Sequence, residues 1–208
     1  MIDELGRAIC TTVKQFQEHP LDFLSERDIQ ALLFVELRNA TRELRYSYDG
    51  GGKNHRFGFP ERFCVHPVTT EYHVYKGKND CFDIAVLSEE PDPKSDIWRQ
   101  PCRIAIEIKL WQPGYGKPKY RMDVEKLRRY QEHLQKAVSP ERVFMGIAML
   151  FVHPYGTQRP TAIIEERSGD AYPEDGIALH LVTKEGHWWK QFPGPASLQG
   201  WPDRTLGQ

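Results

Sequence analysis

Two short segments in the middle of the chain have the clearest strand pattern. Residues 81–87 and 102–110 are rich in β-branched and other apolar residues, and turn-favouring residues bound each of them. A polar linker containing Pro91, Pro93 and Pro101 lies between them. The pattern predicts two strands joined by this linker.

Three segments carry the helical pattern. Residues 2–18 predict a short helix that ends before Pro20. A later helix is expected from near Asp123 to near Val138. Another begins after Ser25, and its apolar stripe predicts that one side faces a core. That stripe consists of Ile29, Leu32, Leu33, Leu37, Ala40 and Leu44.

The limits of this last helix follow from particular residues. Ser25 is expected to be its N-cap, with Asp28 three residues later in a variant of the capping box. The helix is expected to continue to near Tyr48, because the glycines at 50–52 favour open backbone. A loop of Gly, Pro and basic residues should follow, up to about Pro60.

The remaining sequence predicts further strands and one short helix. Segment 63–75 predicts a strand that leads into a hairpin at 76–79, and the apolar run 143–152 predicts a central strand. Residues 160–168 predict a short helix and 177–183 a strand. This order predicts an α/β fold in which helices flank a central mixed β-sheet.

Length and composition limit the number of domains and the classes of partner and location that are expected. The 208 residues suit one domain, 1–208, with an irregular tail at 192–208. A net charge of −1 does not argue for nucleic acid, but an acidic site can cancel a local basic patch. No apolar stretch is long enough for a membrane, and the first residues do not resemble a signal peptide. A cytoplasmic location is therefore expected, with reduced cysteines at Cys10, Cys64, Cys81 and Cys102.

Asp83, Glu107 and Lys109 are charged residues within the two apolar strands. Side chains alternate between the faces of a strand, so Glu107 and Lys109 share a face of the second strand. Asp83 shares a face of the first strand with Ala85, and it lies beside Glu107 if the strands pair. The opposite face of the first strand is expected to carry Phe82, Ile84 and Val86.

These charges suggest a metal site. Two neighbouring carboxylates repel each other unless a cation lies between them, and such hard oxygen ligands suit Mg²⁺ or Mn²⁺. Lys109 directs an amine to the same place, where it can orient water or stabilise a phosphoryl group. The alternative is a cross-strand salt bridge on a solvated face, with Asp83 as a neighbour of Glu107 and Lys109.

The order of these residues resembles a known signature. Asp83, followed after a linker by Glu107, Ile108 and Lys109 in a hydrophobic strand, is similar to the PD-(D/E)XK motif of restriction-endonuclease-like nucleases. Phe82 stands where that motif has proline. The resemblance implies that Asp83 and Glu107 hold the metal, that the Ile108 carbonyl is a further ligand, and that Lys109 assists the attacking water.

The resemblance extends to the flanking helices. It implies a restriction-endonuclease-like core over about residues 25–185, with a further acidic residue on the helix before the strands. Glu26 is the candidate and Glu36 its rival, although the helix dipole alone also favours an acid in the first turn. Gln131 matches a polar inward residue of the later helix, and an ordinary polar residue at the edge of the stripe is the alternative.

Two loops combine basic and aromatic residues. One contributes Lys117, Lys119, Tyr120 and Arg121, and the other spans residues 53–57. Basic side chains neutralise phosphates and aromatic rings stack on bases, so both loops are candidates for a nucleic-acid surface. Gln131 is grouped with the first set as a nucleic-acid-binding candidate. Solvated loops are the alternative.

Together these features predict a Mg²⁺- or Mn²⁺-dependent endo- or exonuclease that hydrolyses phosphodiester bonds. The resemblance implies DNA as the substrate, in restriction, repair or mobile-element defence. Two alternatives stay open: a non-catalytic module of the same fold that binds nucleic acid or a protein, and a hydrolase of small phosphates. Many members of that family form homodimers, so a homodimer is one expected arrangement, and no membrane partner is expected.

Overall fold

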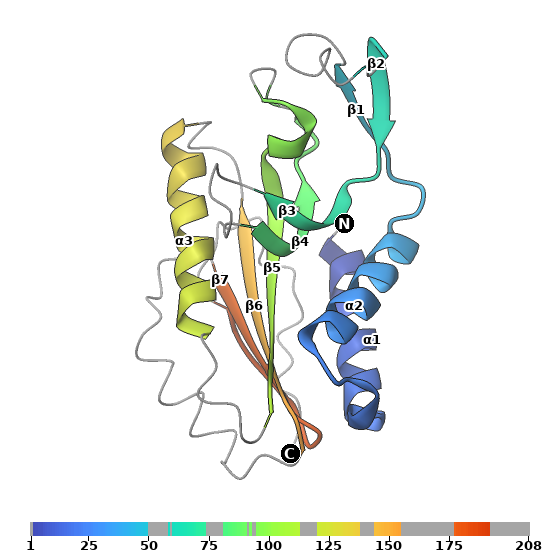
Figure 1. Ribbon diagram of the computed structural model, residues 1–208, viewed down its shortest axis with the longest axis vertical. Coiled ribbons are helices and arrows are strands. Elements are labelled where there is room, and N and C mark those ends of the chain that lie inside the picture. Colours follow the sequence, from blue (N-terminus) through green and yellow to red (C-terminus); the bar gives the residue numbers. More distant parts are fainter. Residues whose placement is uncertain are drawn as a thin grey trace.

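The computed structural model describes residues 2–49, 58, 60–73, 81–90, 92, 95–112, 120–137, 144–154 and 177–191. In these ranges the chain forms a mixed α/β fold (Figure 1). The helices are α1 (Ile2–Glu18), α2 (Glu26–Ala40) and α3 (Tyr120–Ala137), with short 3₁₀ helices η1 (Pro20–Asp22) and η3 (Ile97–Arg99). The strands are β1 (Tyr46–Asp49), β2 (Arg62–Val65), β3 (Val68–His73), β4 (Cys81–Leu87), β5 (Cys102–Trp111), β6 (Met145–Val152), β7 (Ile177–Val182) and β8 (His187–Gln191).

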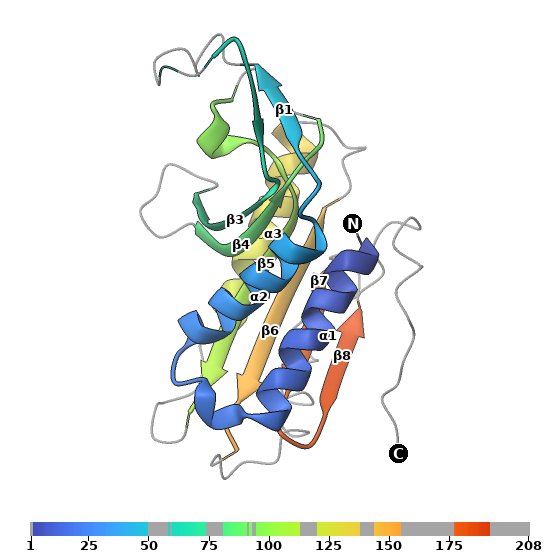
Figure 2. The same ribbon diagram turned by 90° about the vertical axis from the view of Figure 1, so that its right-hand side faces the viewer.

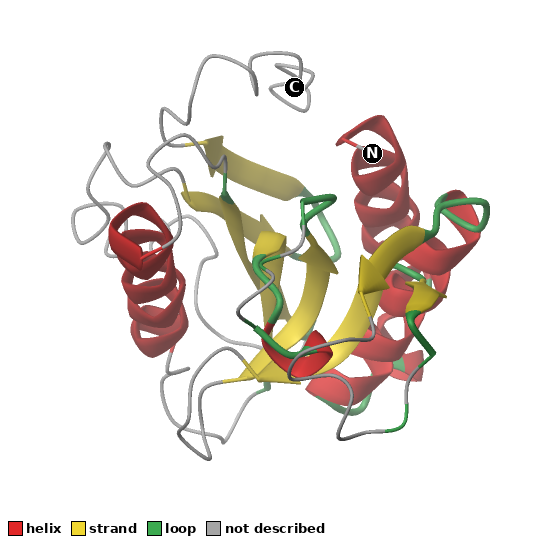
Figure 3. Ribbon diagram, turned by 90° about the horizontal axis from the view of Figure 1, so that it is seen from above, coloured by secondary structure: helices red, strands yellow, loops and turns green. Residues whose placement is uncertain are grey.

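The described strands form two sheets. Six of them lie in the order β3-β4-β5-β6-β7-β8, while β1 and β2 pair antiparallel in a separate sheet. The central strands β5, β6 and β7 are parallel, and the outer pairs are antiparallel. Helices α1 and α2 cover one face of the large sheet and α3 covers the other (Figure 3). The predicted mixed sheet with flanking helices is therefore confirmed.

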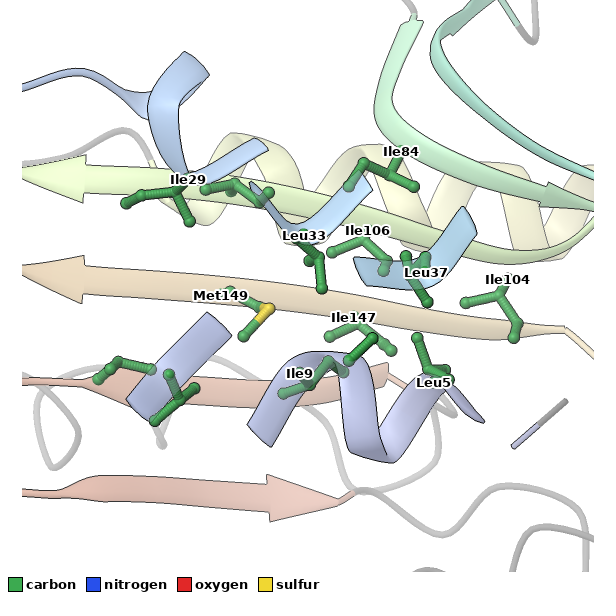
Figure 4. Close-up of a cluster of buried hydrophobic side chains, with 14 of the residues drawn as sticks. Leu5, Ile9, Ile29, Leu33, Leu37, Ile84, Ile104, Ile106, Ile147 and Met149 are labelled. Atoms are coloured by element: carbon green, nitrogen blue, oxygen red, sulfur yellow. The ribbon is translucent and has the colours of Figure 1, made fainter. Parts of the chain in front are cut away.

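Apolar side chains fill both interfaces between the sheet and the helices. On the α1 and α2 side, the helix stripes pack on isoleucines of β5 and β6, as Figure 4 shows. This cluster includes Leu5, Ile9, Ile29, Leu33, Leu37, Ile104, Ile106 and Ile147. On the α3 side, Val124, Leu127 and Leu134 pack with Ala105, Ala148 and Leu181. Every residue of β6 is buried, which explains its uninterrupted apolar sequence.

Several predicted elements are confirmed. The helix at 2–18 is α1, and the strands at 81–87 and 102–110 are β4 and β5, the latter one residue longer. The predictions at 143–152 and 177–183 correspond to β6 and β7, and the third helix begins at Tyr120 rather than near residue 123. Ser25 caps α2, and its backbone nitrogen donates a 2.7 Å hydrogen bond to Asp28 Oδ2.

The expected length of the second helix is wrong. Helix α2 ends at Ala40, and the residues around Tyr48 form strand β1. The Thr41 hydroxyl donates a 2.6 Å hydrogen bond to the Leu37 carbonyl, which occupies one acceptor of the last turn. Tyr46 and Tyr48 are buried where β1 pairs with β2. Burial of alternate aromatic side chains therefore outweighs the local helical pattern.

The single strand expected at 63–75 is also wrong. This segment contains two strands in different sheets, β2 and β3. Pro67 lies between them, and proline has no N–H for a strand ladder. Its carbonyl instead accepts a 2.9 Å hydrogen bond from the Leu87 nitrogen, which positions the entry to β3 against β4. Strand β8 was not predicted at all.

Other expectations fall outside the described residues. These are the hairpin at 76–79, the helix at 160–168, the basic loop at 53–57 and the tail at 192–208. Among the helices that the structure describes, none combines the length and apolar character of a membrane-spanning helix.

Candidate active site

The candidate site lies where β4 separates from β5. The antiparallel register pairs Ile84 with Ile106, so the next position would place Asp83 opposite Glu107. There Asp83 Oδ2 accepts a 2.7 Å hydrogen bond from the backbone nitrogen of Ile108. The side chain of Asp83 thus replaces a strand partner and is held against β5, beside Glu107.

The neighbouring strand β3 bends at the same level. Glu71 has φ of 49°, in the left-handed region that residues with a Cβ rarely adopt. The next residue, Tyr72, pairs with Phe82, so the register places Glu71 opposite Asp83. The bend therefore coincides with the position from which Asp83 reaches β5.

This bend changes the face that Phe82 occupies. The sequence predicted that Phe82 shares a face with Ile84 and Val86, and that prediction is wrong. Ile84 and Val86 pack on the α1 and α2 side, whereas Phe82 packs on the α3 side with its ring 5.2 Å from that of Tyr130. Strict alternation fails because the strand is not regular at Asp83.

The first turn of α2 brings an acid to β5. Glu26 Oε2 lies 3.2 Å from Lys109 Nζ, and Glu26 Oε1 accepts a 3.4 Å hydrogen bond from the Leu110 nitrogen. The structure thus brings Glu26 together with the predicted residues of β5. The rival Glu36 lies almost three turns further along α2, about 15 Å along the helix axis, and is too far away.

Gln30, one turn after Glu26, contacts the bend directly. Its amide nitrogen donates hydrogen bonds of 2.7 Å to the Asp83 carbonyl and 3.2 Å to Glu71 Oε1. The same helix face therefore holds the side chain of Lys109 and the backbone of Asp83. Sequence reasoning missed Gln30, although its spacing of four from Glu26 was a signal that the two share a face.

Helix α3 adds a second acid and a second amine from the opposite side of the sheet. Asp123 Oδ2 lies 3.7 Å from Lys109 Nζ, and Lys126 Nζ lies 2.7 Å from Glu107 Oε1. The two helix residues are three apart and share a face. No sequence pattern indicated that Lys126 belongs here, because its partners come from other elements.

Burial perturbs the two carboxylates of the predicted motif. Glu107 is only 2% exposed, and this burial, followed by the charge of Asp83, raises its pKa to about 9. Burial also raises the pKa of Asp83, although its hydrogen bond to the Ile108 nitrogen acts in the opposite direction. Both shifts mean that burial makes ionisation of these carboxyl groups less favourable than in water.

Asp123 and Lys109 are also perturbed. Burial raises the pKa of Asp123 to about 6, against the nearby charge of Lys109. Burial alone would lower the pKa of Lys109, but the charges of Asp123, Glu26 and Asp83 outweigh it, so that the pKa of this amine is raised. Lys109 is therefore held as an ammonium.

The charges of the cluster are not balanced. Four carboxylates, on Glu26, Asp83, Glu107 and Asp123, share two ammonium groups, on Lys109 and Lys126. When all are ionised, two negative charges remain in excess. A divalent cation supplies that amount of charge, and oxygen donors of this kind suit Mg²⁺ or Mn²⁺. The donor set therefore fits such an ion.

The described ranges contain no group of three or more His, Cys, Asp or Glu side chains arranged to hold a metal ion. The predicted ligand set does not need such a group. It consists of two carboxylates, on Asp83 and Glu107, and the backbone carbonyl of Ile108. Gln131 lies further along α3, with its Oε1 buried and without a hydrogen bond from any described residue. No contact among the described residues joins it to the cluster.

The nucleic-acid candidates remain predictions. Lys117 and Lys119 lie outside the described residues, and Tyr120 and Arg121 are the first two residues of α3. Comparisons with protein-family models, curated proteins and solved structures found no match to this chain.

Proposed function

We propose that this protein is a Mg²⁺- or Mn²⁺-dependent nuclease of the PD-(D/E)XK type that hydrolyses phosphodiester bonds in DNA. The observation that carries the proposal is the convergence of Asp83, Glu107 and Lys109 where β4 separates from β5. A mixed sheet with helices on both faces is compatible with the restriction-endonuclease-like core that the motif implies. The choice of DNA rests on the resemblance of the motif.

Asp83 and Glu107 would hold the ion, with the Ile108 carbonyl as a further ligand. The N–H and C=O of a strand residue point toward the same edge, and Asp83 accepts the Ile108 N–H at that edge. When bound, the divalent ion supplies positive charge that stabilises the attacking and leaving oxygens of an in-line displacement. Without it, burial and mutual repulsion favour protons on the two acids.

Lys109 acts on the water and on the phosphate. Because neighbouring acids keep it protonated, it donates hydrogen bonds and does not accept the proton of the water. Its ammonium orients the water and stabilises the charge that develops on phosphoryl oxygens. The water oxygen forms a new bond to phosphorus and one ester P–O bond breaks. One proton of the water ends on the departing oxygen, which becomes a hydroxyl, and the other stays on the phosphate product. Glu26 and Asp123 position the ammonium for this step.

The test is cleavage of linear, nicked and single-stranded DNA by the purified protein with Mg²⁺ or Mn²⁺. Wild type should cleave at least one of these substrates, and Lys109→Ala should cleave it about 10²- to 10³-fold more slowly. Lys136→Ala is the matched control, because Lys136 lies on α3 but its side chain is 79% exposed. Equal cleavage by wild type and Lys109→Ala would end the proposal.

Two other results would identify the alternative functions. Binding of DNA without cleavage under any of these conditions would indicate a non-catalytic module on this fold. Cleavage of small phosphodiesters without binding or cleavage of DNA would indicate a small-phosphate hydrolase. In either case DNA would not be the substrate of the Asp83, Glu107 and Lys109 cluster.

A further inference from the structure

Lys126 is an almost buried cation inside the candidate site. Its side chain is 13% exposed, and its Nζ lies 2.7 Å from Glu107 Oε1 and 2.8 Å from the carbonyl oxygen of Cys81. The Phe82 ring centroid lies 5.8 Å from the same nitrogen. The ammonium therefore joins β5, through Glu107, to the first residue of β4.

This contact differs from an ordinary surface ion pair on the same helix. Lys136 and Glu132 also form a pair on α3, at 3.6 Å, but their side chains are 79% and 54% exposed. Glu107 is 2% exposed, so water cannot solvate its charge, and a buried carboxylate needs a cation or a proton. In the metal-free protein the Lys126 ammonium is the cation that lies against Glu107.

A metal ion at the proposed site would compete with this ammonium for the Glu107 carboxylate. An ion held by Asp83 and Glu107 shares the Glu107 carboxylate with Lys126, and two cations on one buried carboxylate repel each other. The Cys81 carbonyl offers a partner that is not part of the proposed ligand set. Lys126 can therefore leave Glu107 and keep one hydrogen bond.

We propose that Lys126 occupies the cation position beside Glu107 while metal is absent, and that a divalent ion bound by Asp83 and Glu107 displaces its ammonium. This inference rests on the proposed metal site. The site then has two states: Lys126 contacts Glu107 in one, and a divalent ion takes its place in the other.

The exchange can be measured by NMR on the full-length protein labelled with ¹⁵N and ¹³C. The scalar coupling between Lys126 Nζ and the carboxyl carbon of Glu107, across the 2.7 Å contact of Nζ with Oε1, reports the ion pair itself. Its disappearance in Lys126→Arg assigns the signal to Lys126. The coupling should be present without metal and lost at saturating Mg²⁺. Its loss should follow the same titration curve as Mg²⁺ binding measured by calorimetry.

Two controls separate displacement from general effects. KCl at matched ionic strength should leave the coupling intact, because a buried pair is screened little by salt. Asp83→Asn removes one proposed ligand but does not contact Lys126, so this variant should keep the coupling at the same Mg²⁺ concentration.

The outcomes distinguish this inference from the function on which it rests. If Mg²⁺ binds and the coupling persists, the displacement is wrong while the metal site stands. If the coupling is absent from the metal-free protein, Lys126 does not hold the cation position beside Glu107. If calorimetry detects no binding of Mg²⁺ or Mn²⁺, both the inference and the proposed nuclease site are wrong.

Discussion

Glu26 and Lys109 are far apart in the sequence, yet Glu26 Oε2 and Lys109 Nζ lie 3.2 Å apart in the folded protein. Asp123 Oδ2 approaches the same nitrogen to 3.7 Å. Glu26 opens α2 and Asp123 lies in the first turn of α3, and these helices cover opposite faces of the sheet (Figure 2 shows α2 in front of β5 and α3 behind it). One ammonium on β5 is thus held from both sides.

Substitutions in this ion pair should separate the role of Lys109 from that of its partner. Lys109→Ala removes a donor aimed at developing charge, so kcat should fall about 10²- to 10³-fold. Glu26→Gln disturbs only the orientation of that donor and should cost about 10- to 100-fold. Steady-state cleavage of DNA measures both, with Glu132→Gln on the exposed face of α3 as the control. Full activity of Glu26→Gln would show that Lys109 needs no such partner.

Divalent ions should stabilise the wild-type protein against heat. At a Mn²⁺ concentration 100 times the Kd, binding adds about 2.7 kcal/mol to the free energy of unfolding. For a chain of this size that corresponds to a Tm increase of roughly 5–10 °C. Asp83→Ala should abolish the increase, whereas Glu43→Ala, at a side chain that is 86% exposed, should retain it. Differential scanning fluorimetry provides the measurement.

Glu107 should make the metal-free protein less stable as the pH rises. Burial and the charge of Asp83 raise its pKa from 4.5 to about 9, so between these values the folded state binds more protons than the unfolded state. The stability that is fully present below about pH 4.5 is therefore lost as the pH rises through about 9. Glu107→Gln lacks this proton, so it should lose less free energy of unfolding between about pH 5 and pH 9. Urea unfolding of wild type and Glu107→Gln in EDTA, at a series of pH values, measures this difference. The same dependence of the free energy of unfolding on pH in both proteins would contradict it.

A buried histidine pair should act in the opposite pH direction. His180 Nδ1 lies 2.9 Å from His187 Nε2, and burial lowers their pKa values from 6.5 to about 3 and about 4. The folded state binds fewer protons than the unfolded state in this range, so stability falls as the pH falls below about 6.5. His187→Gln should show a smaller loss of stability than wild type between about pH 7 and pH 4.

The control for the histidine pair is His19→Gln, at an exposed position after α1. Its urea unfolding curves should keep the wild-type dependence on pH. If His187→Gln and His19→Gln lose the same free energy of unfolding on acidification, the pair does not contribute to acid sensitivity.

Gly146→Ala should test how closely α3 approaches the sheet. A Cβ at Gly146 would lie 3.2 Å from both Ile177 Cγ1 and Leu127 Cβ, which is closer than most side chains tolerate. Overpacking of this kind costs about 1–3 kcal/mol. Leu127 follows Lys126 in α3, so a displaced helix should also weaken the contact of Lys126 with Glu107. Urea unfolding measures this loss of stability. An unchanged urea midpoint would show that α3 can shift away from the sheet without loss of stability.

Elements governed by local pattern were predictable. The charges of Glu107 and Lys109 stand two apart in an apolar run, and strand alternation alone places them on one face. Ser25 and Asp28 likewise determine the start of α2 through contacts within one turn. Where long-range packing competes with local preference, prediction failed: Tyr46 and Tyr48 form a buried strand and not the end of a helix.

The sequence by itself determined which residues carry charge in which strands, because alternation and helical periodicity are properties of neighbours along the chain. Only the tertiary structure decided that β4 separates from β5 at Asp83. It also decided that Lys126 contacts Glu107 from helix α3, which covers the sheet face opposite to α2. Those contacts depend on how helices and strands pack, and on a bend at Glu71 that no local sequence pattern predicts. Packing therefore decides the partners of each charge, and the partners decide its pKa and its chemistry.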